Sequence, residues 1–419
     1  MDFVYHIIIG TAILAASPFI LLKMIINPRF RTDTLSRLRG GTRVPELSGC
    51  VWVHASSVGE VRAAKILIRV LKEHVKNLPI VLSTFTAMGY EQAVKEGVDH
   101  VFRLPPDFPY WIHPLFDKLN PKILILIEAE FWPCLLRRCK YLGVPSILVN
   151  GRITERAASS YEKSQQVFRW ITQGIAKFSM RTEADAERIL KLGIDPAKVT
   201  VNGNIKFDAL PGQSKEIPEP DEQSDSNSKL VVFGSTRPGD EGPAMQAIVD
   251  LRKKIPGLRF VIAPRHVQRC REVEDLIKEF DMDYVLHSQL GKNLDWNREL
   301  ILLDTLGELN GYYARAAAAF VGGGLNPRFG GHNILEPAGY SIPVVFGKHM
   351  NNFEEEARLL LQSGGGIQID RPKELYETLH KLMTDPQERQ RIGNAAGKTV
   401  RQNRGAVERN LNLILALLN

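Results

Sequence analysis

The sequence predicts an α/β protein made of two Rossmann-like domains that face a central cleft, with a membrane-anchor helix at the N-terminus. With 419 residues the chain is too long for a single hydrophobic core. Short apolar strands alternate with amphipathic helical stretches, which is typical of parallel α/β sheets. A polar stretch rich in Pro and Ser divides the strands into two similar series, and paired α/β halves predict a ligand cleft between them.

The composition shifts predict four segments. Residues 1–27 are expected to be the membrane anchor, 28–210 the first domain, 211–229 the linker and 230–419 the second domain with C-terminal helices. The helical stretch over 386–418 either closes the second domain or crosses back onto the first. The expected strands are Val51–Val53, Ile80–Ser83, Ile123–Ile127, Ser146–Val149 and Ile175–Ser179, then Leu230–Phe233, Phe260–Ala263, Tyr284–His287, Leu300–Leu303, Ala319–Val321 and Pro343–Phe346.

The N-terminal segment differs from the rest of the chain. Residues 4–22 carry no formal charge, and a bilayer-spanning helix needs about 20 apolar residues. Basic residues follow at once, so the positive-inside bias predicts a single-pass anchor with the body in the cytoplasm. A cleaved signal peptide is the competing interpretation, because Ala15-Ala16-Ser17 resembles a cleavage site. The absence of Lys and Arg from residues 1–3 argues against cleavage.

Charge and cysteine content limit the partners. The net charge of +7 favours anionic partners such as nucleic acid, phosphorylated ligands or acidic membranes. The four cysteines form no CxxC pair and no zinc-site spacing, which favours a reducing cytoplasm. Asp281-Met282-Asp283 matches an Asp-x-Asp metal motif, but it precedes a strand and no acid or His cluster accompanies it. We therefore expect no metal site.

The most informative stretch is residues 54–60, His-Ala-Ser-Ser-Val-Gly-Glu, between the strand Val51–Val53 and a helix over about residues 61–75. Small residues allow a tight turn and the close approach of a ligand. Glu60 then falls at a helix N-terminus and at the carboxyl end of a strand, where α/β folds place their chemistry. The alternative is that Glu60 only complements the helix dipole, which favours its ionised form, while Ser56 or Ser57 caps the helix.

Two further acids follow another strand. Glu128 and Glu130 come directly after Ile123–Ile127, and acids two apart in an extended chain share a face. Like charges this close tend to separate by role, one structural and the other in the cleft. Which acid is structural stays open at this point. The alternative is a capped turn before the helix that starts at Trp132-Pro133.

The second series of strands carries candidate anion ligands. Arg265 follows Phe260–Ala263, and a guanidinium fork matches two phosphate oxygens, although a surface ion pair would explain it too. His266 is either a ligand or a polar neighbour. Glycines at 322–324 and 330–331 precede a helix, so their N–H groups are expected to face an anion. Glu336 would accept hydrogen bonds from a ribose. The spacing fits neither the Walker loop nor the GxGxxG fingerprint.

The helix after Glu60 presents a basic face, because its cationic residues recur at steps of three and four. Such a stripe is usually a solvated face; near an anchor, it also suits an anionic lipid surface. The residues are Arg62, Lys65, Arg69, Lys72 and Lys76.

Taken together, several ordered motifs resemble the lipid A Kdo transferase family, the 3-deoxy-D-manno-octulosonic acid (Kdo) transferases of Gram-negative bacteria. The resemblance covers nearly the whole chain. It departs from the family at Arg237 and Asp240, where His and Glu are usual, and at Met88, where Thr is frequent. The motifs are HASSVGE (54–60), EAEFWP (128–133), NGNIKFD (202–208), GSTRPGDE (234–241), APRH (263–266) and GGHNILEPA (330–338).

The resemblance implies a GT-B fold in which the first domain binds a phosphorylated lipid A precursor (lipid IVA) and the second binds CMP-Kdo, at the inner membrane, in lipopolysaccharide biosynthesis. It implies an inverting reaction without cofactor, metal or nucleic acid. It assigns the base to Glu60 and transition-state support to Glu130 and Lys206, with Lys206 and Arg265 neutralising donor charge in place of a metal. The implied donor contacts are Pro264, Arg265, Gly307, Glu308, Leu309, Asn333, Ile334, Leu335 and Glu336.

Two alternatives share this architecture. One is a GT-B transferase that uses a UDP-sugar on lipid or peptidoglycan intermediates, and the other is a UDP-sugar epimerase. An epimerase needs neither an anchor nor a lipid surface, and the order of the motifs argues against both.

Overall fold

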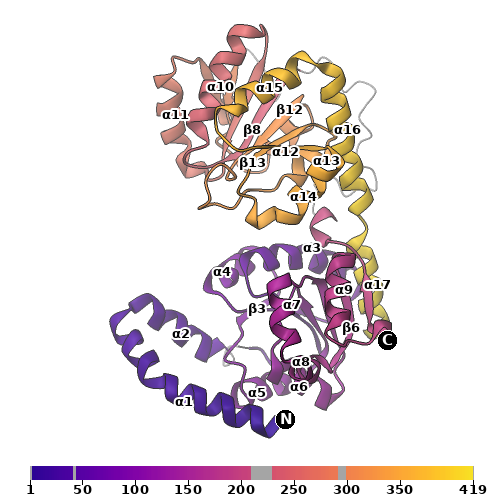
Figure 1. Ribbon diagram of the computed structural model, residues 1–419. Helices are drawn as coiled ribbons and strands as arrows, with labels where there is room; N and C mark the ends of the chain where they lie inside the picture. Colours follow the sequence, from indigo (N-terminus) through magenta and orange to yellow (C-terminus); the bar gives the residue numbers. More distant parts are fainter. Residues whose placement is uncertain (1, 41–43, 209–228, 291–298, 419) are drawn as a thin grey trace. The chain divides into compact units, whose positions relative to one another are not determined.

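The computed structural model describes residues 2–40, 44–208, 229–290 and 299–418. The chain divides into two compact units. The first comprises Met1–Ala209 with Arg404–Asn419, and the second comprises Leu210–Asn403. Each unit is built on one seven-stranded sheet, and every pair of neighbouring strands described in these sheets is parallel (Figure 1).

The sheet of the first unit has the order β3-β2-β1-β4-β5-β6-β7. From β1 the strands are added toward one edge, ending at β3, and from β4 they are added toward the other, ending at β7. The carboxyl ends of β1 and β4 therefore form the switch point at which α/β sheets bind ligands. The strands are β1 (Cys50–His54), β2 (Ile80–Thr84), β3 (His100–Arg103), β4 (Pro121–Ile127), β5 (Ser146–Gly151), β6 (Ile175–Met180) and β7 (Val199–Val201).

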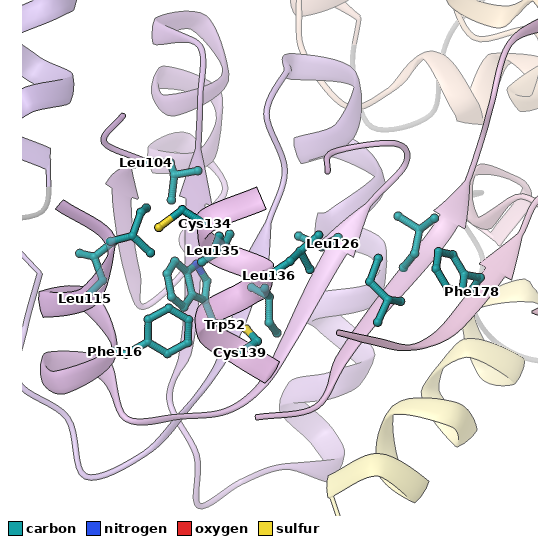
Figure 2. Close-up of a cluster of buried hydrophobic side chains, with 14 of the residues drawn as sticks. Trp52, Leu104, Leu115, Phe116, Leu126, Cys134, Leu135, Leu136, Cys139 and Phe178 are labelled. Atoms are coloured by element: carbon teal, nitrogen blue, oxygen red, sulfur yellow. The ribbon is translucent and has the colours of Figure 1, made fainter. Parts of the chain in front are cut away.

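Helices cover both faces of this sheet, which explains why its central strands are apolar on both sides. On one face, the fully buried Trp52 packs in a cluster with α5 and α6, where the centroid of its ring lies 5.4 Å from that of Phe116 (Figure 2). On the other, Val51 and Val53 pack with α3 and α17. The helices of this unit are α1 (Asp2–Ile26), α2 (Pro28–Gly40), α3 (Val58–His74), α4 (Ala87–Lys95), α5 (Pro109–Leu119), α6 (Pro133–Leu142), α7 (Glu155–Glu162), α8 (Gln165–Thr172), α9 (Glu183–Lys191) and α17 (Ala406–Leu418).

The sheet of the second unit has the order β10-β11-β9-β8-β12-β13-β14, with its reversal between β8 and β12. Its strands are β8 (Leu230–Thr236), β9 (Arg259–Pro264), β10 (Tyr284–Leu286), β11 (Leu300–Leu302), β12 (Ala318–Val321), β13 (Val344–Gly347) and β14 (Gly366–Ile369). Its helices are α10 (Glu241–Lys254), α11 (Cys270–Glu279), α12 (Leu309–Tyr313), α13 (Leu335–Gly339), α14 (Glu354–Ser363), α15 (Glu374–Thr384) and α16 (Pro386–Asn403).

Every strand expected from the sequence is present, and the short strands β3, β7 and β14 at the sheet edges are additions. The placement of residues 404–419 in the second domain is wrong. The carboxylate of Asp208 accepts hydrogen bonds from the backbone N–H groups of Gly405 (2.8 Å) and Val407 (2.7 Å), and Ile414 is buried in the core of the first unit. The expected linker, residues 211–229, lies outside the described residues except for Lys229.

The expectation of a membrane-spanning anchor over residues 4–22 is not supported. Within the described ranges, no helix combines the length and apolarity that crossing a membrane requires. Near the start of α1, the Tyr5 hydroxyl donates a hydrogen bond to Asp107 (3.3 Å), and its ring lies 5.3 Å from that of Trp170. Pro18 lies inside this helix.

Candidate active site

Glu60 is built into the N-terminus of α3, directly after the carboxyl end of β1. Ser57 is the N-cap, and its hydroxyl donates to Glu60 Oε1 (2.7 Å), while the Ser56 backbone N–H donates to Glu60 Oε2 (2.8 Å). The arrangement resembles a capping box, in which an acid at the third helical position reaches back to the turn. The capping contacts of the alternative interpretation are therefore present, and they also hold the carboxylate in one place.

The environment of Glu60 changes its protonation. Burial raises the pKa of Glu60 to about 7, and the negative charge of Glu130 adds to the rise, against hydrogen bonds from Ser57 and Ser56 that lower it. Burial thus opposes the preference for the ionised form that the helix terminus was expected to give. A carboxyl group with a pKa near neutrality is well matched to proton transfer.

Glu128 and Glu130 do not lie on one extended segment. Glu128 has a φ of 65°, so the chain turns sharply after β4. Its carboxylate forms ion pairs with Arg181 (4.0 Å) and Lys206 (3.8 Å). The charge of Glu130 acts on Glu60 more strongly than that of Glu128, and burial raises the pKa of Glu130 itself although Ser56 and Trp132 oppose the rise. Glu128 is therefore the charge-balancing acid and Glu130 the partner of Glu60.

Lys206 reaches the same edge from a different part of the chain. It lies in the 3₁₀ helix η3 (Ile205–Asp208), whose Ile205 N–H donates to Asn150 Oδ1 at the end of β5 (3.1 Å). The Lys206 N–H donates to Asn204 Oδ1 (3.1 Å). The structure thus brings Lys206 to Glu128, and Glu130 to Glu60, at one edge of the sheet.

Arg181 is the residue of this cluster that the sequence interpretation missed. It directly follows β6, as Arg265 follows β9, and its side chain is almost fully buried. The pattern that singled out Arg265, a cationic residue immediately after an apolar strand, is therefore present at Arg181 as well.

In the second unit, Arg265 follows β9 at the sheet edge. Its backbone N–H donates to the carbonyl of Thr236 (3.0 Å), which places it beside the end of β8. There the Arg237 Nε–H donates to His332 Nε2 (3.0 Å). The His266 ring is largely exposed, and the little desolvation that it has, together with the charges of Arg237, Arg265 and Arg269, lowers its pKa. The edge is therefore cationic, as an anion site requires.

The glycines at 322–324 serve packing more than anion binding. The Gly323 N–H donates to Asp240 Oδ2 (2.7 Å), which also accepts the Arg237 N–H (2.8 Å), and the Gly322 N–H donates to Gly234. A Cβ on Gly322 would lie 2.6 Å from that same Asp240 oxygen. The expectation that these N–H groups face a ligand is wrong for both glycines, because the close approach of the two strand ends uses them.

The other expected donor residues occupy two loops. The Asn333 amide donates to Glu336 Oε1 (3.0 Å) and its Oδ1 accepts the Leu335 N–H (3.2 Å), while Ile334 and Leu335 are fully buried. On the second loop, Gly307 is exposed with a φ of 109° and precedes α12. Glu308 accepts the Thr305 hydroxyl (2.8 Å), Leu309 is partly buried and Pro264 is buried at the end of β9.

The basic face of α3 carries less net charge than its sequence indicates. Lys65 forms an ion pair with Glu96, and Lys72 forms one with Asp99 (2.7 Å), acids that the spacing argument did not include. Arg69 remains exposed on the same face. Among the described residues, no group of three or more His, Cys, Asp or Glu side chains converges in a way that would hold a metal ion.

The fold of the chain is similar to that of several solved protein structures. MurG from Acinetobacter baumannii covers 89% of this chain and 100% of its own, with a TM-score of 0.58 and 11% identity. UDP-GlcNAc 2-epimerase from Neisseria meningitidis covers 88% and 100%, with a TM-score of 0.57 and 14% identity. At such identities these likenesses show the fold alone, which is a GT-B-like pair of parallel α/β sheets.

Sequence relatives decide between the functions that this fold supports. The model of the family described as 3-deoxy-D-manno-octulosonic-acid transferase (kdotransferase) matches residues 29–209. The 3-deoxy-D-manno-octulosonic acid transferase of Haemophilus influenzae is 31% identical over 403 residues, which cover 94% of either chain. The chain belongs to the Kdo transferase family. It is a glycosyltransferase that transfers Kdo, which sets aside the epimerase and the UDP-sugar transferase.

Proposed function

We propose that the chain is an inverting, metal-independent glycosyltransferase that moves Kdo from CMP-Kdo to a phosphorylated lipid A precursor, lipid IVA, in lipopolysaccharide biosynthesis. The observation that carries the proposal is Glu60: a buried carboxyl at the carboxyl end of β1, fixed by two hydrogen bonds, with a pKa near 7. Such a group accepts a proton at the pH at which the cell works.

The proposed reaction forms one bond and breaks another. The Glu60 carboxylate takes the proton of an acceptor hydroxyl, and the acceptor oxygen attacks the anomeric carbon of Kdo. The bond from that carbon to the phosphate oxygen breaks on the opposite face, and CMP leaves with the electron pair. Glu130 keeps Glu60 basic through its charge. Lys206 supplies positive charge where negative charge develops.

We propose that the second unit binds the donor. Arg265 at the end of β9 would hold the CMP phosphate, and the loops with Asn333, Glu336 and Gly307–Leu309 would hold the nucleoside. The support is the cationic sheet edge at Arg237 and Arg265. Arginine charge at the departing phosphate would replace the divalent ion that other transferases use.

We also propose that the first unit binds an anionic inner-membrane surface from the cytoplasmic side. On α1, large apolar side chains are exposed, and basic residues follow in α2. Apolar side chains beside cations are typical of helices that lie in the plane of an anionic membrane. The exposed side chains are Phe19, Leu21, Leu22, Ile25 and Ile26.

The test is incubation of the full chain with CMP-Kdo and the lipid A precursor, with products identified by mass spectrometry and the new anomeric linkage by NMR. We expect a mass gain of whole Kdo residues, an inverted linkage and the same rate in EDTA. Transfer from a UDP-sugar but not from CMP-Kdo would contradict the donor. Strict dependence on a divalent ion would contradict the metal-free reaction.

A further inference from the structure

A fully buried histidine ends β1, the strand that leads to Glu60. His54 is the last residue of β1, and the strand register places it opposite Ser83 of β2. Its Nδ1 lies 2.8 Å from Ser83 Oγ, and its Nε2 accepts a hydrogen bond from the Trp132 indole N–H (2.9 Å). His54 therefore connects the sheet interior to Trp132, which follows Glu130 by two residues.

Two indoles fix the direction of these hydrogen bonds, because an indole N–H only donates. Trp132 donates to Nε2, so that nitrogen carries no proton and the neutral ring must carry it on Nδ1. Nδ1–H then donates to Ser83 Oγ, which also accepts the Trp52 indole N–H (2.7 Å), while the Ser83 hydroxyl turns toward the Val53 carbonyl (3.5 Å). Every donor in this set has an acceptor, and no charge is needed.

The imidazole stays neutral in this environment. Burial lowers the pKa of His54 to about 3, so it carries no proton on Nε2 at any pH at which the enzyme works. Ring contacts also restrain Trp132. The centroid of its ring lies 5.9 Å from that of His54, in an edge-to-face arrangement, and 4.9 Å from that of Phe85. The indole is thereby fixed in both position and rotation.

The held groups are those that contact Glu130. Ser56 and Trp132 both lower the pKa of the Glu130 carboxyl, so their side chains lie near it, and Ser56 Oγ lies 3.1 Å from His54 Nε2. Since the Nε2 lone pair already accepts from Trp132, the Ser56 hydroxyl hydrogen is available to Glu130. We propose that His54, as the neutral Nδ1–H tautomer, is a positioning residue that orients Trp132 and Ser56 and through them the Glu130 carboxylate.

This inference rests on the proposed function, in which Glu130 acts beside Glu60. The test compares His54→Asn with His54→Gln in the full chain. An Asn amide reaches about as far as Nδ1, so it keeps the contact to Ser83 and loses the acceptor for Trp132. A Gln amide reaches about as far as Nε2 and keeps that acceptor. Both variants have a similar polar side chain, so each controls for the general effect of replacing a buried histidine.

We expect His54→Asn to lower kcat by about 10- to 100-fold, the loss that a misplaced catalytic group produces, with the KM for CMP-Kdo unchanged. His54→Gln should recover most of the rate. In a Glu130→Gln background His54→Asn should have no further effect, because the group that it positions is already disabled. An equal loss of rate in both backgrounds, or wild-type kcat in His54→Asn, would overturn the proposal.

A readout without turnover separates this proposal from the proposed function. The Trp132 indole ¹H–¹⁵N resonance, assigned with Trp132→Phe, should move when His54→Asn removes its acceptor and should stay close to the wild-type position in His54→Gln. If Glu130→Gln keeps the wild-type rate, the catalytic assignment of Glu130 fails while the resonance still reports whether His54 holds Trp132. An unmoved resonance in folded His54→Asn would contradict the positioning role whatever the activity.

Discussion

The negative charge of Glu130 raises the pKa of Glu60, although the two residues belong to segments 70 residues apart in the sequence. Their strands, β1 and β4, are hydrogen-bonded neighbours at the switch point of the first sheet, and both residues follow the carboxyl ends. Burial, and then this charge, make Glu60 a weaker acid than an isolated glutamate and thus a stronger base.

The first prediction concerns pH. A base must be ionised to act, so the rate should be low below the pKa of Glu60 and rise as pH passes about 7. Glu130→Gln removes a neighbouring negative charge, which lowers the pKa of Glu60 and shifts the acid limb of the kcat profile to lower pH. Profiles of both proteins between pH 5 and 9 check this. An unshifted limb would mean that another group titrates.

The second prediction separates the roles of Glu128 and Glu130. Glu128→Gln removes the carboxylate that pairs with the buried Arg181 and with Lys206, and it should lower the free energy of unfolding by about 1–3 kcal/mol. Glu130→Gln should not lower it, because burial already disfavours that charge. Urea unfolding at pH 8 can be followed by the fluorescence of the first unit's tryptophans. Equal stability of the two variants would contradict the assignment of Glu128 as the charge-balancing acid.

The third prediction concerns the donor. Arg265→Ala should weaken CMP binding by about 10- to 150-fold, since a hydrogen bond to a charged group contributes about 1.5–3 kcal/mol. Arg271→Ala, an exposed arginine of α11, is the matched control for loss of charge and should bind CMP normally. Calorimetric titration with CMP measures both. If Arg265→Ala binds CMP with normal affinity, the alternative that Arg265 only forms a surface ion pair is favoured.

The fourth prediction concerns the basic face of α3. Arg69→Glu should raise the KM for the phosphorylated lipid acceptor, because attraction to an anionic surface contributes about 1 kcal/mol per basic residue. The effect should shrink at high salt. Arg358→Glu on α14 makes the same charge change at another exposed site and should leave this KM unchanged. A KM that Arg69→Glu does not change would favour the solvated-face interpretation.

The alternation of strands and helices predicted most of the fold, because buried parallel strands are continuous apolar runs that stand out from amphipathic helices. Edge strands such as β7 (Val199–Val201) are short and half-buried, so their pattern is weak. The return of α17 to the first unit depends on long-range contacts of Asp208, which no local pattern contains.

For the site, the sequence predicted correctly which candidate residues follow which strand, but not how their side chains interact. Spacing alone could not tell Glu128 from Glu130, since the left-handed turn at Glu128 and the partners Arg181 and Lys206 decide it. Neither could it give the pKa of Glu60, which depends on burial and on a residue from another strand. The glycines near β12 misled the sequence argument, because their N–H groups serve Asp240 and the neighbouring strand.

The central claim is that Glu60 is the base of Kdo transfer, and the rate of Glu60→Gln tests it most directly. The substitution keeps the shape and one accepting oxygen for the cap but removes the basicity. Turnover of CMP-Kdo with the lipid A precursor should fall by about 10²- to 10⁴-fold, with CMP affinity unchanged. Glu73→Gln, an exposed glutamate of the same helix, is the matched control and should keep the wild-type rate. Near-wild-type turnover of folded Glu60→Gln would contradict the claim and leave Glu60 as a helix cap.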